Sequence, residues 1–89
     1  DENAPKIKKT YYTDLNGDII EKGNIGQEVY LVVEGINLAE KEADLDLTDN
    51  EIDFEYKGEH LKNDILKGYV FQNNEIEHIK LKIIEQKNN

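Results

Sequence analysis

The chain has 89 residues and a formal net charge of −9, with 20 acidic side chains against 11 basic ones, all lysine. A chain of this length allows one domain, and its acidity argues against binding to nucleic acid or to an anionic membrane surface. Ser, Cys, Arg, Trp and Met are absent, which removes disulfides, thiolate metal sites and the commonest catalytic nucleophiles. Ile, Leu, Val and Phe still make up 25 of the 89 residues, so we expect a folded domain that is not an enzyme.

Both ends of the chain are polar, and we expect residues 1–5 to form a linker, residues 6–85 one domain and residues 86–89 a tail. The missing initiator Met indicates a processed product or a piece of a longer protein. No run approaches the roughly 20 apolar residues that a membrane-spanning helix needs, so no membrane insertion is expected. A monomeric module in a string of domains is the expected arrangement.

Short apolar runs, separated by Gly, Asn and Asp about every ten residues, predict an all-β fold, an antiparallel β-sandwich of about seven strands. The first strand is expected at Ile7–Thr13. Tyr11 and Tyr12 are neighbours in this strand, so one side chain should face the core and the other should face outward. The two tyrosines are therefore candidate binding residues, through whichever ring faces outward. Asn16–Gly17 then predicts a type I′ turn, with Ile19–Glu21 as a short returning strand.

The same hairpin carries oxygen-bearing side chains at alternating positions, Asp14, Asn16 and Asp18. This spacing is typical of the opening of an EF-hand-type calcium loop. The pattern then departs from such a loop, because Ile19 stands where a Gly is needed and Ile25 where a bidentate Glu is needed. A hairpin with solvated acids is the favoured interpretation, calcium binding by these three residues is the alternative, and no other cofactor is expected.

The central strand is predicted at Glu28–Glu34, where five successive apolar or aromatic residues indicate burial on one face and at least part of the other. A strand of this kind needs a second layer packed on it, which favours a sandwich over a single hairpin. After it, the segment Asn37–Glu42 is expected to form one helical turn at most, with Asn37 as its cap.

Leucines at 45 and 47, and then apolar residues at 52, 54 and 56, alternate with acids and predict two strands with one buried and one solvated face. If these strands are neighbours, Asp44 and Asp46 would lie opposite Asp53 and Glu55. Each pair of like charges would cost about 0.2–1 kcal/mol. A cation or a basic partner could offset this repulsion, although simple solvation is the favoured interpretation.

The last two strands are predicted at Ile65–Phe71, with Gly68 as a bulge, and at Ile79–Ile83. Lys80 and Lys82 are interpreted as charges that protect an edge strand from aggregation. His60 and His78 are expected to be surface residues. The predicted core comprises Ile7, Val29, Leu31, Val33, Leu45, Leu47, Phe54, Ile79, Leu81 and Ile83. The aromatic residues assigned to the core faces are Tyr30, Phe54, Tyr56 and Phe71.

Two stretches of the first half resemble a bacterial immunoglobulin-like domain: the opening from Ala4 to Ile7, and the run from Gly26 to Leu38. In that group a Pro begins the first strand, and a Gly-x-x-Val-x-Leu-x-Val-x-Gly-x-Asn-Leu run forms the second strand and its exit turn. The hairpin from Tyr11 to Gly17 and the arginine-free composition are also similar to modules of large exported proteins of Bacteroidetes-like bacteria, some of them tied to type VI-type secretion machines.

The resemblance implies an immunoglobulin-like sandwich that lacks the Cys and Trp of antibody-type domains and has no common catalytic site. It implies an exported or cell-surface location and a non-catalytic role, as a spacer or as an interaction module that binds a protein partner or neighbouring domains. Two alternatives are a calcium- or carbohydrate-binding accessory module, and a small acidic inhibitor or immunity-type protein that covers a basic active site.

Overall fold

The computed structural model describes residues 4–47 and 52–85 of the chain. Residues 1–3 of the predicted linker and the whole predicted tail lie outside the described residues. A 3-10 turn (Lys62–Asp64) precedes the sixth strand. The seven strands are β1 (Lys6–Thr13), β2 (Glu28–Ile36), β3 (Glu42–Asp46), β4 (Ile52–Tyr56), β5 (Glu59–His60), β6 (Ile65–Val70) and β7 (Ile76–Glu85).

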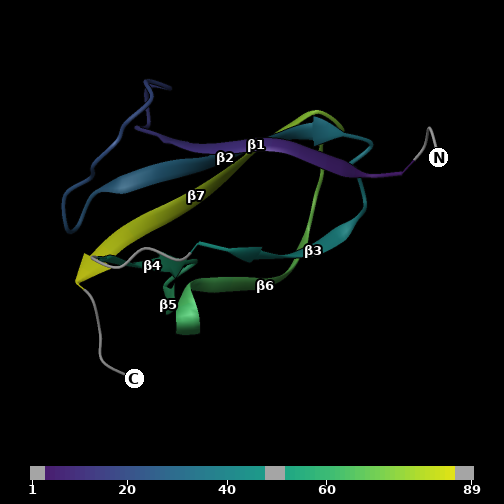
Figure 1. Ribbon diagram of the computed structural model, residues 1–89. Helices are drawn as coiled ribbons and strands as arrows, with labels where there is room; N and C mark the ends of the chain where they lie inside the picture. The colour runs from purple at the N-terminus through teal and green to yellow at the C-terminus, as the bar shows by residue number, and fades with distance from the viewer. Residues whose placement is uncertain (1–3, 48–51, 86–89) are drawn as a thin grey trace.

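The strands form two antiparallel sheets (Figure 1). The larger sheet has the order β1-β2-β7-β4-β5, and the smaller sheet consists of β3 and β6. Leucines of the smaller sheet belong to the same buried cluster as the central strands of the larger one, so the two sheets enclose one core. The protein is therefore an all-β antiparallel sandwich of seven described strands, and the predicted fold class is confirmed.

The centre of the larger sheet is the pair β2–β7, whose inward side chains come from every second residue. Val29 lies opposite Leu81 and Leu31 opposite Ile79, so the apolar positions of both strands share one face. Nine of the ten predicted core residues are buried, and the core also includes residues that the sequence pattern did not assign. These additions are Leu38, Leu61 and Leu66.

Ile7 is the wrong member of the predicted core, because its exposed fraction is 41%. It lies in the first half of β1, an outer strand of the sheet, where all residues from Lys6 to Thr10 are exposed. Tyr30 is also wrongly assigned to the core face. It alternates with the inward residues Val29 and Leu31, and therefore lies on the outer face of the sheet.

The hairpin after β1 differs in its turn from the prediction. The N–H of Gly17 donates to the carbonyl of Asp14 (3.1 Å), and the N–H of Asp14 donates to the carbonyl of Asp18 (2.9 Å). Gly17 has a φ of +93° whereas Asn16 keeps a negative φ. A type I′ turn needs positive φ at both residues, so this is a three-residue loop with a left-handed Gly. The predicted return strand is also wrong, because only Ile19 forms an isolated bridge, with Thr13.

Two other local predictions have different outcomes. The segment after β2 does not form a helical turn, since Asn37 and Glu40 have positive φ values of 55° and 69°. The predicted bulge at Gly68 is confirmed. Ala43 pairs with Tyr69, and Leu45 pairs with Leu66. The two pairs are two residues apart on β3 and three residues apart on β6, so β6 contains one extra residue between them. Gly68 has the positive φ of +66° that this bulge requires.

Candidate functional site

Tyr11 and Tyr12, the candidate binding residues of the first strand, lie on opposite faces of the larger sheet. Tyr12 packs against the core, where its ring stacks on Phe54 with centroids 5.5 Å apart and planes 10° apart. Tyr11 lies opposite Val32 in the β1–β2 ladder and points to the outer face. Each tyrosine therefore belongs to a different surface of the molecule.

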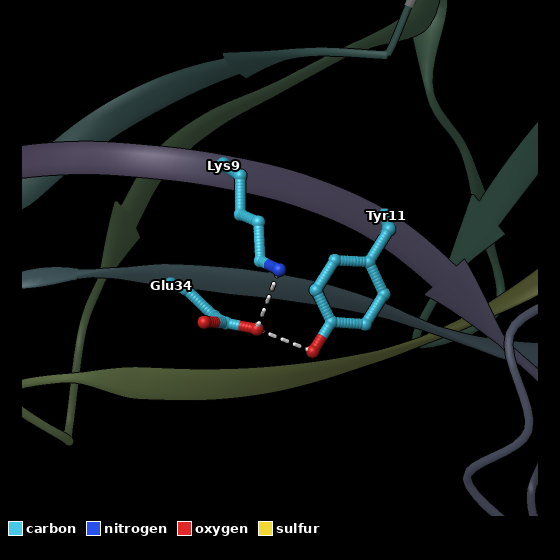
Figure 2. A network of polar contacts seen from close by, with 3 residues as sticks. All are labelled: Lys9, Tyr11 and Glu34. Carbon is cyan, nitrogen blue, oxygen red and sulfur yellow. Dashed lines mark hydrogen bonds and ion pairs between the residues drawn. The ribbon is translucent and has the colours of Figure 1, made fainter.

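Tyr11 is held on the outer face by a polar contact with the neighbouring strand (Figure 2). Its hydroxyl donates a hydrogen bond to Glu34 Oε2 at 2.5 Å, and Lys9 Nζ lies 3.8 Å from the same oxygen. This hydrogen bond, together with burial and the negative charge of Glu34, raises the pKa of Tyr11 above its ordinary value. The phenol thus stays protonated, and its O–H group already donates to Glu34. Lys9 is largely exposed and Glu34 is partly exposed, so their ion pair contributes little stability.

The outer face of the larger sheet has a buried valine at its centre, although none of the described strands packs over this face. Val32 is only 1% exposed, and its cross-strand neighbours are Tyr11 on β1 and His78 on β7. The ring of His78 meets Tyr30 edge to face, with centroids 5.7 Å apart. The aromatic rings therefore cover this valine themselves, and His78 is exposed as predicted.

The candidate calcium ligands Asp14, Asn16 and Asp18 lie in the loop after β1. Asp14 Oδ1 accepts hydrogen bonds from the backbone N–H of Asn16 (2.9 Å) and of Asp18 (3.0 Å). This carboxylate oxygen is thus used to close the turn from within. Across residues 4–47 and 52–85, no group of three or more His, Cys, Asp or Glu side chains is placed to hold a metal ion.

Replacing Asp14 with Ala should lower the free energy of unfolding by about 1 kcal/mol, because two backbone N–H groups lose their acceptor. Asp18→Ala, which leaves that acceptor in place, should cost less than half as much. Neither loss should depend on millimolar Ca²⁺ in a urea titration. A wild-type melting temperature that rises with Ca²⁺, and no longer rises in either variant, would instead establish the calcium alternative.

The predicted acidic ladder is wrong, because its two strands belong to different sheets. β3 pairs with β6, whereas β4 pairs with β5 and β7. Asp44 accepts a hydrogen bond from the N–H of Gly68 at 2.8 Å and so supports the bulge of β6. Asp53 is only 5% exposed and contacts His60, with Oδ2 and Nε2 2.7 Å apart. The acids of these two strands therefore have separate local roles.

The Asp53–His60 pair joins the two strands of the β4–β5 hairpin. Such a pair is the orienting half of a catalytic triad, but the sequence contains neither Ser nor Cys to act as its nucleophile. His60 is half-buried, with 16% of its side chain exposed, and neither residue lines the two cavities described below. The arrangement fits a structural pair, which satisfies a buried carboxylate at the end of the sheet.

Glu77 is the other buried acid that sequence reasoning missed. It is 3% exposed, and its carboxylate accepts hydrogen bonds from the hydroxyl of Tyr69 (2.5 Å), from Asn73 Nδ2 (2.8 Å), and from the backbone N–H groups of Gln72 and Asn73. Burial works to raise the pKa of Glu77, but these hydrogen bonds outweigh it and leave the pKa lowered. Glu77 stands two residues before Ile79, so it lies on the same inward face of β7. This alternation was the feature of the sequence that could have predicted the burial of Glu77.

An apolar pocket opens at the end of the sandwich beside the long β1–β2 connection. Its volume is about 240 Å³, and Glu21 and Lys22 are the charged residues among those that line it. Ile19 and Ile25 flank the segment 20–23 that lines this pocket, and they are 70% and 64% exposed. The pocket is lined by the core-facing side chains Tyr12, Ile20, Val29, Ile52, Phe54 and Ile83. This pocket and the connection that lines it, with its two exposed isoleucines, form the candidate site.

A scan against protein-family models and searches of curated proteins and of solved structures found no match to this chain. Among the described residues, no helix has the length and apolar character that crossing a membrane would require.

Proposed function

We propose that this chain is a non-catalytic protein-interaction module, which binds a protein partner at the apolar pocket. The observation that carries the proposal is the combination of a pocket open to the core with Ile19 and Ile25 exposed on the connection that lines it. Isolated exposed apolar residues are ordinary on protein surfaces, but exposed apolar residues on a connection that also lines an apolar pocket favour an interface.

The size of the pocket favours a protein partner over a small molecule. Pockets for small ligands usually enclose about 300–1,000 Å³, and this one has about 240 Å³. That volume suits an apolar side chain inserted from a partner, which is how the central residues of many protein interfaces are buried. Ile19 and Ile25 would then bury additional apolar area around the inserted side chain.

The charge of the chain specifies the character of the partner. A net charge of −9 on 89 residues attracts a basic surface and repels an acidic one. Complementary charge mainly accelerates association, and its contribution falls as salt is added. The partner is therefore a basic protein that presents an apolar side chain, and its association rate should decrease with ionic strength.

The non-catalytic role is supported by the composition, which provides neither Ser nor Cys as a nucleophile for the Asp53–His60 pair. The resemblance to bacterial immunoglobulin-like modules supports a place in an exported multidomain protein. The antiparallel sandwich agrees with that family at the level of architecture. In such a setting the module would hold a secreted partner or a neighbouring domain in position.

The test is affinity capture from the source organism with the wild-type domain and a pair of double variants. Ile19→Ser with Ile25→Ser removes the exposed apolar groups of the connection that lines the pocket, whereas Ile7→Ser with Val70→Ser removes two exposed apolar groups elsewhere. A basic protein captured by the wild type and by the second variant, but lost with the first, is the expected result. Its capture should weaken as salt increases.

Two outcomes would contradict the proposal. A protein retained equally by both double variants would bind through a different surface. Beads that enrich no protein at low salt, with all variants folded by circular dichroism, would favour the passive spacer role.

A further inference from the structure

The strand β7 has an open edge over its first half, on the side away from β2. β2 pairs with β7 from Ile76 to Lys82, whereas β4 pairs with it only from Lys82 to Glu85. The reason is local: β4 ends in the turn at Lys57 and Gly58, whose φ values are positive at 52° and 84°. In the part of the chain that the structure describes, no strand pairs with this side of β7 from Ile76 to Leu81.

The alternation of the backbone shows which groups lie on this edge. The N–H of Ile83 donates to the carbonyl of Gln27 (2.9 Å), and the C=O of Ile83 accepts from the N–H of Gly26 (2.7 Å). Both groups therefore point to the β2 side of β7. In a β-strand these groups alternate from side to side, so those of His78 and Lys80 point to the β4 side. That side has no β-partner there among the described residues. Two N–H donors and two C=O acceptors are thereby presented in the spacing that an added strand uses.

A cavity of about 410 Å³ follows the same edge. Five consecutive residues of β7, His78 to Lys82, line it. Because successive side chains point to opposite faces of a sheet, a cavity that touches five in a row runs along the edge of the strand. The turn residues Lys57 and Gly58 after β4 also line the cavity, as do Tyr56 and Tyr69, whose rings meet edge to face with centroids 6.3 Å apart.

The charge around this edge is the reverse of that of the whole chain. Three lysines line the cavity, against two acids, in a chain whose net charge is −9. Lys80 Nζ forms an ion pair with Glu28 Oε2 at 3.4 Å. Lys57 Nζ lies over the ring of Tyr56, 5.3 Å from its centroid. A strand that carries acidic side chains would meet opposite charges here, whereas a basic strand would be repelled.

We propose that the edge of β7 from Ile76 to Lys80 accepts an extended acidic segment of a partner protein as an additional β-strand. Main-chain hydrogen bonds to His78 and Lys80 would provide the affinity, and the lysines would select for acidic side chains. The prediction that Lys80 and Lys82 protect an edge strand is wrong, because β7 lies between β2 and β4 and, among the described residues, only its first half is unpaired on the β4 side. The inference uses different residues from the apolar pocket, and it rests on the proposed function only in taking the ligand to be a protein.

The test uses synthetic peptides and the amide hydrogen exchange of the intact domain. The probe is a seven-residue peptide that alternates valine and glutamate, and one control alternates valine and lysine. A second control repeats the acidic peptide with N-methyl groups on alternate backbone amides, which cannot pair as a strand. The acidic peptide should slow exchange of the His78 and Lys80 amides by at least about tenfold, and neither control should do so.

Charge variants locate the binding and separate it from the apolar pocket. Lys80→Glu should weaken binding of the acidic peptide by about tenfold or more, whereas Lys8→Glu, an exposed lysine of β1, should leave it nearly unchanged. The Ile19 and Ile25 variants should bind the peptide normally even if they lose the captured protein, so the two proposals can fail independently.

Three results would overturn the inference. The first is no saturable binding of the acidic peptide, and the second is binding that leaves the His78 and Lys80 amides unprotected. The third is protection of these amides that appears without peptide as the protein concentration rises. That pattern would mean that the edge pairs with a second copy of the chain instead of a partner segment.

Discussion

Replacing Gly35 with Ala should lower the free energy of unfolding by about 3 kcal/mol, a large loss for the addition of one methyl group. A Cβ atom at this position would lie 2.2 Å from the carbonyl oxygen of Lys6 and 3.2 Å from Cα of Ile7. Both are backbone atoms of β1, which pairs with β2 at this point. The methyl group would therefore push the first half of β1 off the sheet, and no side-chain rotation could relieve the contact.

Gly23→Ala is the matched control, because its Cβ would also meet an atom at 2.2 Å. That atom is Cδ1 of Ile83, the end of a side chain that can change rotamer. We expect a loss of less than about 1 kcal/mol from this variant in urea unfolding. Equal losses from the two variants, or an unchanged stability of Gly35→Ala, would contradict the close approach of β1 to β2.

Replacing Glu77 with Gln should lower the free energy of unfolding at neutral pH by about 2 kcal/mol. The carboxylate accepts bonds from the Tyr69 hydroxyl, the Asn73 side chain, and the N–H groups of Gln72 and Asn73. The amide keeps one acceptor oxygen, and its NH₂ group would face other donors. Because one carboxylate connects β6, the loop after it and β7, the substitution should weaken all of these hydrogen bonds together.

The same substitution should also flatten the dependence of stability on pH. The pKa of Glu77 is lowered in the folded protein, so the unfolded chain takes up the proton at a higher pH than the native chain. The stability that the carboxylate contributes is complete above the ordinary pKa of a glutamate and is lost as the pH falls through the lowered value. The difference between wild type and Glu77→Gln should therefore shrink on acidification.

Urea unfolding of both proteins between neutral pH and about pH 3 measures this difference. Tyr69 stays a donor throughout, because burial and its bond to Glu77 raise the pKa of its phenol. Glu75→Gln is the control, since Glu75 is an exposed acid two positions away and should change the profile little. A difference that stays constant across this range would show that Glu77 contributes by packing and not as a carboxylate.

Alternation along each strand was sufficient to predict most of the core, because it depends only on neighbouring residues. It placed Val29, Leu31 and Val33 inward correctly, and a glycine inside a predicted strand indicated the bulge at Gly68. The errors arise where a residue's position depends on distant pairing. Ile7 has the pattern of a core residue, but its half of β1 is exposed, which no local pattern shows.

Most of the polar features could not be predicted for the same reason. The acidic ladder required β3 and β4 to be neighbours, a condition that the sequence could not test, and the two strands belong to different sheets. The open edge of β7 depends on where β4 turns away, which only the strand order reveals. The burial of Glu77 was accessible from the alternation of its strand, but its hydrogen-bond partners come from the separate segment 69–73.

The position of β7 has a consequence for the way the chain reaches its fold. β1 and β2 form one ribbon, β4 and β5 form another, and β7 alone lies between them in the larger sheet. A chain being synthesised therefore holds two unconnected ribbons until residues 76–85 emerge. β2 pairs with a strand that begins some forty residues later in the sequence. The loop-closure entropy of this pairing should slow folding to roughly milliseconds or longer. During that interval the apolar face of β2 is the surface that a chaperone would shield.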